Sequence, residues 1–105
     1  MSNYIIVRTF CDKKEIANLI VDSLLNKKLV AGSQISEIDS KYWWGGVSEC
    51  AREYKIEFRS RKDKFDEIVS EIRKLHDYDV AEISSIDIDN ANDEFFKWID
   101  ESIEK

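Results

Sequence analysis

Apolar positions along this chain change their spacing several times, and each change marks a predicted element. Residues 4–10 (YIIVRTF) are rich in β-branched and aromatic side chains, which favours a short buried strand. Asp12 followed by Glu15 has the spacing of a capping box at the start of a helix. That helix runs to about residue 28, because its apolar stripe has helical spacing: Ile16, Leu19, Ile20 and Leu24.

The middle of the chain predicts a long antiparallel hairpin. Residues 29–44 show no helical stripe and read as one strand, in which Gly32 marks a bulge or a close backbone approach. Gly45 and Gly46 supply the turn, since glycine reverses a chain tightly. Residues 54–59 then alternate apolar and charged side chains, which predicts a strand with one wet or partner-facing side.

Two more helices and one more strand are predicted after the hairpin. Ser60 can cap a helix whose stripe is Phe65, Ile68, Val69, Ile72 and Leu75. Residues 80–89 form a strand with a bulge, because Ile83 breaks the alternation set by Ile86 and Ile88. Asn92 can cap a final helix with the stripe Phe95, Trp98, Ile99 and Ile103.

The predicted order is β-α-β-β-α-β with an added C-terminal helix, in one domain over residues 1–105. Right-handed crossovers place both main helices on one face of a four-stranded antiparallel sheet. The fold class is therefore α+β, a ferredoxin-like sandwich with a long protruding hairpin. No helix is expected to cover the second face of the sheet, so this face and the hairpin need a partner.

Composition narrows the functional classes. The net charge is −6 and no stretch is rich in Lys or Arg, which argues against a nucleic-acid partner. No run approaches the roughly 18 apolar residues of a membrane span, and the N-terminus lacks the features of a secretion signal, so we expect a cytoplasmic protein without a membrane partner. Cys11 and Cys50 are expected to be free thiols in that reducing compartment.

The single histidine is the centre of the candidate chemistry. His76, Asp77 and Asp79 lie within four residues and Glu82 follows, a set of imidazole and carboxylate groups that suits zinc, nickel or copper. The alternative is structural, because a histidine at a helix end often serves as a cap and loop aspartates often make turns. Neither cysteine lies in a nucleophile motif, so we expect no enzymatic activity.

Several motifs resemble the CutA divalent-cation tolerance proteins. They are YWWGG at 42–46, Glu53 in the next strand, LHDYDVAEI at 75–83 followed by IDID, and FFKWI at 95–99. The resemblance implies a homotrimer, similar in architecture to the PII signalling proteins, in which the hairpin reaches a neighbour. It also implies an intersubunit cleft in which Glu53, Arg59 and Tyr78 converge with His76 on a small ligand. Gly32 stands where the family commonly has a cysteine considered as a copper ligand.

The same resemblance assigns a role to the hairpin aromatics. Tyr42, Trp43 and Trp44 would each remove on the order of 150–250 Å² from water when buried, so they favour a trimer interface. Monomer core and ligand platform are the alternatives for these rings. The expected function is a homotrimer for divalent metal ion tolerance, copper included, through weak metal binding. The alternatives are a PII-like small-ligand sensor and a structural platform for a protein partner.

Overall fold

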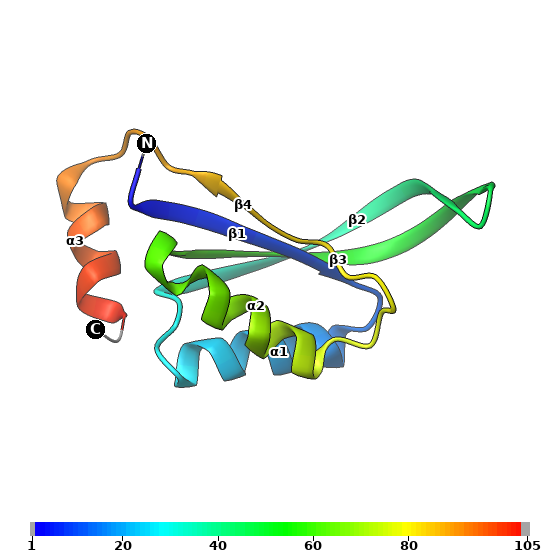
Figure 1. The fold of residues 1–105 in the computed structure, drawn as a ribbon, viewed down its shortest axis with the longest axis horizontal. Coiled ribbons are helices and arrows are strands. Elements are labelled where there is room, and N and C mark those ends of the chain that lie inside the picture. Colours follow the sequence, from blue (N-terminus) through cyan, green and yellow to red (C-terminus); the bar gives the residue numbers. More distant parts are fainter. Residues whose placement is uncertain (1, 104–105) are drawn as a thin grey trace.

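A four-stranded antiparallel sheet and three α-helices make up residues 2–103 of the computed structural model, the part of the chain that the structure describes (Figure 1). The sheet order is β2-β3-β1-β4. Its strands are β1 (Tyr4–Cys11), β2 (Gly32–Trp44), β3 (Val47–Arg61) and β4 (Ile83–Asp87). The helices are α1 (Lys14–Asn26), α2 (Phe65–Leu75) and α3 (Asp93–Ser102). The predicted α+β fold class and element order are confirmed.

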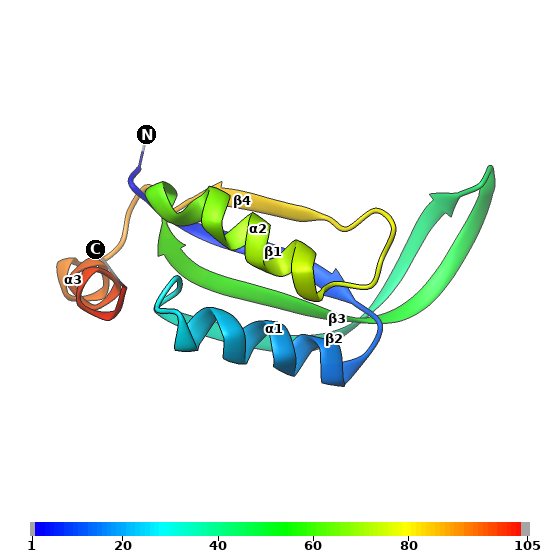
Figure 2. The ribbon, with the colours of Figure 1, turned by 60° about the horizontal axis from the view of Figure 1, so that its bottom comes forward.

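The hydrophobic core lies between the sheet and the helices α1 and α2, which cover one face side by side (Figure 2). Alternate residues of β1 are buried, as the period of a strand requires: Ile5, Val7, Thr9 and Cys11. The helices contribute Ala17, Ile20, Leu24, Ile68 and Ile72 to the same cluster. Leu19 is an exception to the predicted stripe, since half of it is exposed on the outer side of α1. Across the described residues, no helix combines the length and apolarity needed to cross a membrane.

Two of the three predicted helix starts are wrong in detail. Lys13, not Asp12, occupies the N-cap of α1, and no side chain caps this end. Ser60 lies inside β3, where its hydroxyl donates to the Leu29 carbonyl at 2.7 Å. A short 3₁₀ turn over Lys62–Lys64 leads into α2 instead. At α3, Asn92 does occupy the N-cap position, although its side chain makes no capping bond.

The predicted hairpin is confirmed, and its strands are longer than the other two strands of the sheet. β2 and β3 have 13 and 15 residues, whereas β1 and β4 have 8 and 5. β2 and β3 pair in an unbroken register from Gly32↔Arg59 to Trp44↔Val47. Gly45 and Gly46 connect them with φ of 58° and 81°, the left-handed pair that a two-residue type I′ turn requires. The far half of the hairpin extends beyond the helices (Figure 2), giving overall dimensions of 44 × 26 × 22 Å.

β4 is shorter than predicted and contains no bulge. It pairs with β1 without interruption from Ile5↔Asp87 to Thr9↔Ile83. Ile83 therefore faces the helices with Val7 and Thr9, while Ile86 lies on the second face and is exposed. Residues 80–82 belong to the connection from α2.

α3 covers one end of the second sheet face, which the sequence had suggested would have no helix of its own. The Tyr4 ring stacks on Phe96 with centroids 4.2 Å apart, and its hydroxyl donates to Asp100 at 2.7 Å. Arg61 donates to the other Asp100 oxygen at 3.3 Å. The Trp98 ring lies directly against Gly32, so the predicted close approach at this glycine is confirmed. Among the described residues, no helix covers the rest of that face (Figure 1).

Candidate functional site

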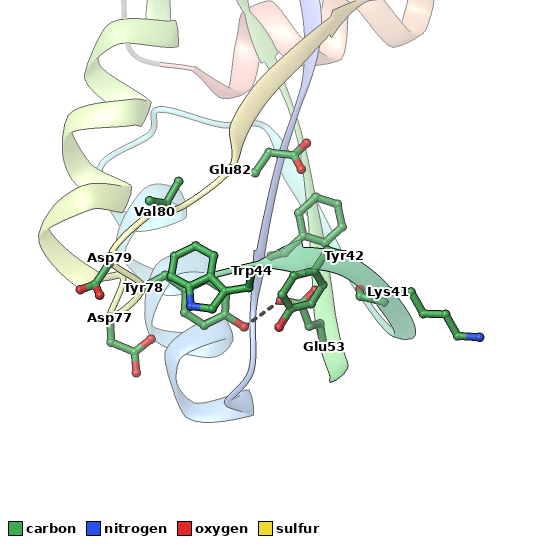
Figure 3. Close-up of a pocket in the computed structure, with 11 residues that line it drawn as sticks. Lys41, Tyr42, Trp44, Glu53, Asp77, Tyr78, Asp79, Val80 and Glu82 are labelled. Carbon is green, nitrogen blue, oxygen red and sulfur yellow. Dashed lines mark hydrogen bonds between the residues drawn. The ribbon is translucent and has the colours of Figure 1, made fainter. Parts of the chain in front are cut away.

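The principal cavity lies between the hairpin and the connection from α2 to β4, and its volume is about 590 Å³ (Figure 3). Its rings are Phe10, Tyr42, Trp44 and Tyr78, and its acidic side chains are Glu53, Asp77, Asp79 and Glu82. Ser40, Lys41 and Val80 complete the lining. The cavity thus combines an aromatic wall with four carboxyl groups.

Glu53 is the most buried acidic group of this cavity, with only 7% of the residue exposed. The Tyr78 hydroxyl donates to its Oε2 at 2.7 Å, which is the dashed line in Figure 3. Burial first, and then the bond to Glu53 and its charge, raise the pKa of Tyr78 far above its usual value. Tyr78 is therefore a neutral donor at any physiological pH. Glu53 and Tyr78, two residues of the cleft that the resemblance implies, are therefore in contact within one chain.

Arg59 does not join this pair. It lies six residues beyond Glu53 in β3, roughly 20 Å along the strand, and it does not line the cavity. Its guanidinium is on the second sheet face, with Nη1 3.9 Å from Glu57, which is also bonded by Arg8. Arg59 Nη1 is buried and has no hydrogen-bond partner within the described residues. Within one chain, the three residues of the expected cleft are therefore not together. Glu53 and Tyr78 lie at the cavity, and Arg59 lies beside Glu57.

His76 holds the end of α2 against β1. Its side chain is 1% exposed, and Nε2 lies 2.6 Å from the Phe10 carbonyl oxygen. Nδ1 accepts from the Tyr78 backbone N–H at 3.1 Å, so we assign the proton to Nε2, which donates to Phe10. Both ring nitrogens are thus occupied. The expectation that His76 offers a metal ligand does not fit this arrangement, and the structural alternative does.

The three other predicted ligands lie at the rim of the cavity. Asp77 pairs with Lys13 at 2.7 Å, and this bond lowers the pKa of the Asp77 carboxyl. Glu82 accepts a bond from the Ser84 hydroxyl at 2.8 Å, and Asp79 is exposed. Nowhere in residues 2–103 do three His, Cys, Asp or Glu side chains come together as a potential metal site. The predicted quartet is therefore not a preassembled metal centre in a single chain.

The three hairpin aromatics divide between the two faces of β2. Tyr42 and Trp44 line the cavity together, whereas Trp43 points to the opposite face and is 77% exposed. Treating them as one group missed this alternation, which strand periodicity could have supplied. Phe10 was also missed, although it alternates with the buried Thr9 and Cys11 and so lies on the cavity side of β1.

Comparison with known proteins agrees with the motifs. A family model described as CutA1 divalent ion tolerance protein matches residues 5–102. The Divalent-cation tolerance protein CutA of Pyrococcus horikoshii is 36% identical, over 96% of this chain and 99% of that protein. The structure is similar to that of the periplasmic divalent cation tolerance protein CutA from Archaeoglobus fulgidus, with a TM-score of 0.93, 35% identity and coverage of 96% and 99%. The structure is also similar to that of CutA1 from Oryza sativa, with a TM-score of 0.94 and 26% identity, over 99% of this chain and 96% of that chain.

Proposed function

Since this chain belongs to the CutA1 divalent ion tolerance protein family, we propose that it contributes to divalent metal ion tolerance by binding such ions weakly. The observation that carries the proposal is the rim of the cavity, where Asp77, Asp79 and Glu82 present exposed carboxylates. Carboxylates and water form weak, labile sites for divalent ions. The ligands we propose are therefore these oxygens rather than the imidazole of His76.

These groups include no ligand that is specific for copper. Thiolate and thioether ligands select copper(I), whereas the rim offers oxygen, a ligand that other divalent ions share. Gly32, which replaces the family cysteine, lies under the Trp98 ring and supplies no sulfur. Cys11 is buried with its thiol bonded to the Lys13 carbonyl, and Cys50 is exposed on the hairpin. We expect low affinity for all three ions, with copper(II) bound more tightly than nickel or zinc, as is general for divalent ions at a given site.

Calorimetric titration with copper, zinc and nickel tests the site. Asp79→Asn combined with Glu82→Gln removes two rim charges without changing side-chain size. Asp66→Asn combined with Glu67→Gln removes the same charge from the exposed side of α2 and is the matched control. We expect the first variant to lose affinity and the second to bind as the wild type does. Equal isotherms for both variants would contradict the assignment to the rim.

We further propose that the protein acts as a homotrimer in which the hairpin contacts a neighbouring copy. Three features support this assembly: the uncovered part of the second sheet face, the exposed Trp43 ring, and the buried Arg59 Nη1, which has no hydrogen-bond partner among residues 2–103. A second copy would shield the ring and supply an acceptor to the guanidinium. Light scattering should give three times 12.3 kDa, and Trp43→Ala should lower this mass. A single-chain mass for the wild type would refute the trimer.

The proposed role is non-enzymatic and cytoplasmic. His76, the single imidazole of the sequence, has both nitrogens bonded to backbone groups, so it is not placed to activate either cysteine. Cys11 and Cys50 are free thiols, consistent with a reducing compartment. Fractionation of the native cells would test the location, since recovery outside the cytoplasm would contradict it.

A second candidate function is small-ligand sensing, and the cavity favours it. Its volume of about 590 Å³ is in the range of pockets that bind metabolites. A thermal-shift screen with nucleotides and metabolites, run with excess EDTA, would separate the two roles. Stabilisation without metal supports sensing, and the absence of any stabilising compound counts against it.

A further inference from the structure

Lys13 already holds one carboxylate of the proposed metal site. Its Nζ lies 2.7 Å from the Asp77 Oδ2 atom, and Asp77 is one of the rim residues through which we propose that divalent ions bind. An ion bound at Asp77 would lie close to this ammonium group, and like charges at such a distance repel each other. Binding of the ion therefore requires the ammonium to leave.

Lys13 approaches Asp77 from the helical side of the sheet. It is the N-cap residue of α1, and its carbonyl accepts bonds from the Ala17 N–H at 3.1 Å and the Cys11 thiol at 3.4 Å. Its backbone is thus fixed, while its side chain is 55% exposed and can move. Asp77 lies beside the end of α2, on the side of the cavity away from Lys41 (Figure 3). The proposed trimer covers the opposite face of the sheet, and this ion pair lies within one chain, so it requires no neighbouring copy.

A second acceptor lies within reach of the Lys13 ammonium. The Asp12 Oδ1 atom is 3.6 Å from the same Nζ. The ammonium can therefore move from Asp77 to Asp12 and keep a counter-charge, and exposed ion pairs of this kind are weak enough to exchange. Because the lysine is tethered beside Asp77, it competes for this carboxylate at a high effective concentration. Lys13 is thus a resident cation that an incoming ion can displace.

We propose that Lys13 is a built-in competitor of divalent ions at Asp77 and that it moves to Asp12 when an ion binds. The inference rests on the metal-binding function proposed above, and it gives a reason why that binding is weak: each ion displaces an ammonium group that is already in place. Lys13 lowers the affinity of the site without contacting the ion. Removing the ammonium should therefore strengthen ion binding, whereas losing a merely structural contact would weaken it or leave it unchanged.

The test measures nickel binding to the full chain by calorimetry in about 150 mM salt, where the Debye length of about 8 Å limits long-range effects of charge. Lys13→Gln removes the ammonium, and Lys13→Arg keeps a cation within reach of Asp77. Lys14→Gln removes the same charge from the next residue, which is exposed and begins α1, and is the matched control. Asp77→Asn, alone and combined with Lys13→Gln, removes the carboxylate for which the ion and the ammonium compete.

We expect Lys13→Gln to bind nickel about twofold to fivefold more tightly than the wild type, the factor that corresponds to the strength of an exposed ion pair. Lys14→Gln and Lys13→Arg should bind nickel nearly as the wild type does. In the Asp77→Asn background, Lys13→Gln should have no effect, because the ammonium no longer competes for a carboxylate there.

Three results would overturn the inference: unchanged or weaker binding in Lys13→Gln, an equal gain in Lys14→Gln, or the same gain in the absence of the Asp77 carboxylate. If the wild type binds nickel in these cases, the proposed metal-binding function is unaffected. If neither the wild type nor Lys13→Gln binds nickel, both the function and the inference fail. Binding by Lys13→Gln alone would support the inference and show that the ammonium blocks the site in the wild type.

Discussion

Replacing Gly32 with alanine tests whether α3 is fitted to β2 at this position. A Cβ atom built on Gly32 lies 2.8 Å from the Trp98 Cη2 atom. Carbon atoms make favourable contact at about 3.5 Å, so the indole would have to move by roughly 0.7 Å. The ring is 42% exposed and can tilt outward, but it also packs against Phe95 at 5.8 Å between centroids. Its displacement therefore disturbs α3.

Two opposing contributions set the expected magnitude. Overpacking of this kind costs about 1–3 kcal/mol, and we take about 2 kcal/mol because the ring is partly free to move. Alanine at this first residue of β2 gains up to about 0.5–1 kcal/mol over glycine, since the unfolded chain has less conformational freedom to lose. Gly32→Ala should therefore destabilise the protein by about 1 kcal/mol. With Trp98→Leu, where the shorter side chain does not reach Gly32, the same substitution should stabilise it by up to about 1 kcal/mol.

Urea unfolding followed by circular dichroism measures all four proteins of this double-mutant cycle at one fixed concentration, because an oligomer's stability depends on concentration. Ser36→Ala, at an exposed position of the same strand, is the control and should change stability by less than about 0.5 kcal/mol. The decisive result is the change of sign between the two backgrounds. The same sign in both would refute the contact between Trp98 and Gly32 as its cause.

Three further substitutions test the polar contacts. Tyr78→Phe should cost about 1–3 kcal/mol, because it leaves the buried Glu53 without a donor. Since the pKa of Tyr78 is raised on folding, the stabilisation by its hydroxyl is complete below the ordinary pKa of 10 and is lost as pH rises above that value. The stability of Tyr78→Phe should therefore decline less steeply at alkaline pH than that of the wild type. An equally steep decline in both proteins would contradict this role of the hydroxyl. Glu71, whose pKa is lowered chiefly by Lys27 and then by Ser23, stabilises the fold above its ordinary pKa of 4.5 and loses this effect as pH falls. Glu71→Gln should therefore unfold in acid with a weaker pH dependence, and a wild-type acid profile would show that the contact contributes nothing. His76→Ala should cost about 1–3 kcal/mol for each backbone partner that it leaves unbonded, as measured by thermal unfolding; a stability within 0.5 kcal/mol of the wild type would contradict the bonded arrangement.

Periodicity was sufficient to predict α2 because burial on one face dominates this helix. The stripe of α2 appears in the structure at Ile68 and Ile72, with Phe65 and Leu75 packed against the same core. β1 was predicted from its composition alone, and the alternation of its buried residues was not predicted. The helix starts could not be found in the same way, since a capping side chain competes with other partners. Ser60 continues the alternation of β3 and bonds to Leu29, which is 31 residues away in the chain. Local spacing carries no information about such a partner.

The candidate site was only partly predictable for the same reason. The resemblance implied an intersubunit cleft that includes Glu53 and Tyr78, and within one chain these two residues are bonded and line one cavity. The state of His76 was not accessible from the sequence, because its partner is the carbonyl of Phe10, 66 residues earlier. A histidine beside two aspartates looks the same whether its nitrogens are free or bonded to backbone. Three-dimensional proximity decides between these states.

At the tip of the hairpin, the choice of residue is limited by backbone handedness and not by side-chain size. Gly45 and Gly46 both have positive φ, yet a Cβ built on either one meets no atom within 4 Å. An L-residue is therefore disfavoured at these positions by handedness and not by lack of room. A chain made by chemical ligation with D-alanine at position 46 should keep the hairpin and gain rigidity, because a mirror-image residue prefers the conformation that glycine adopts here.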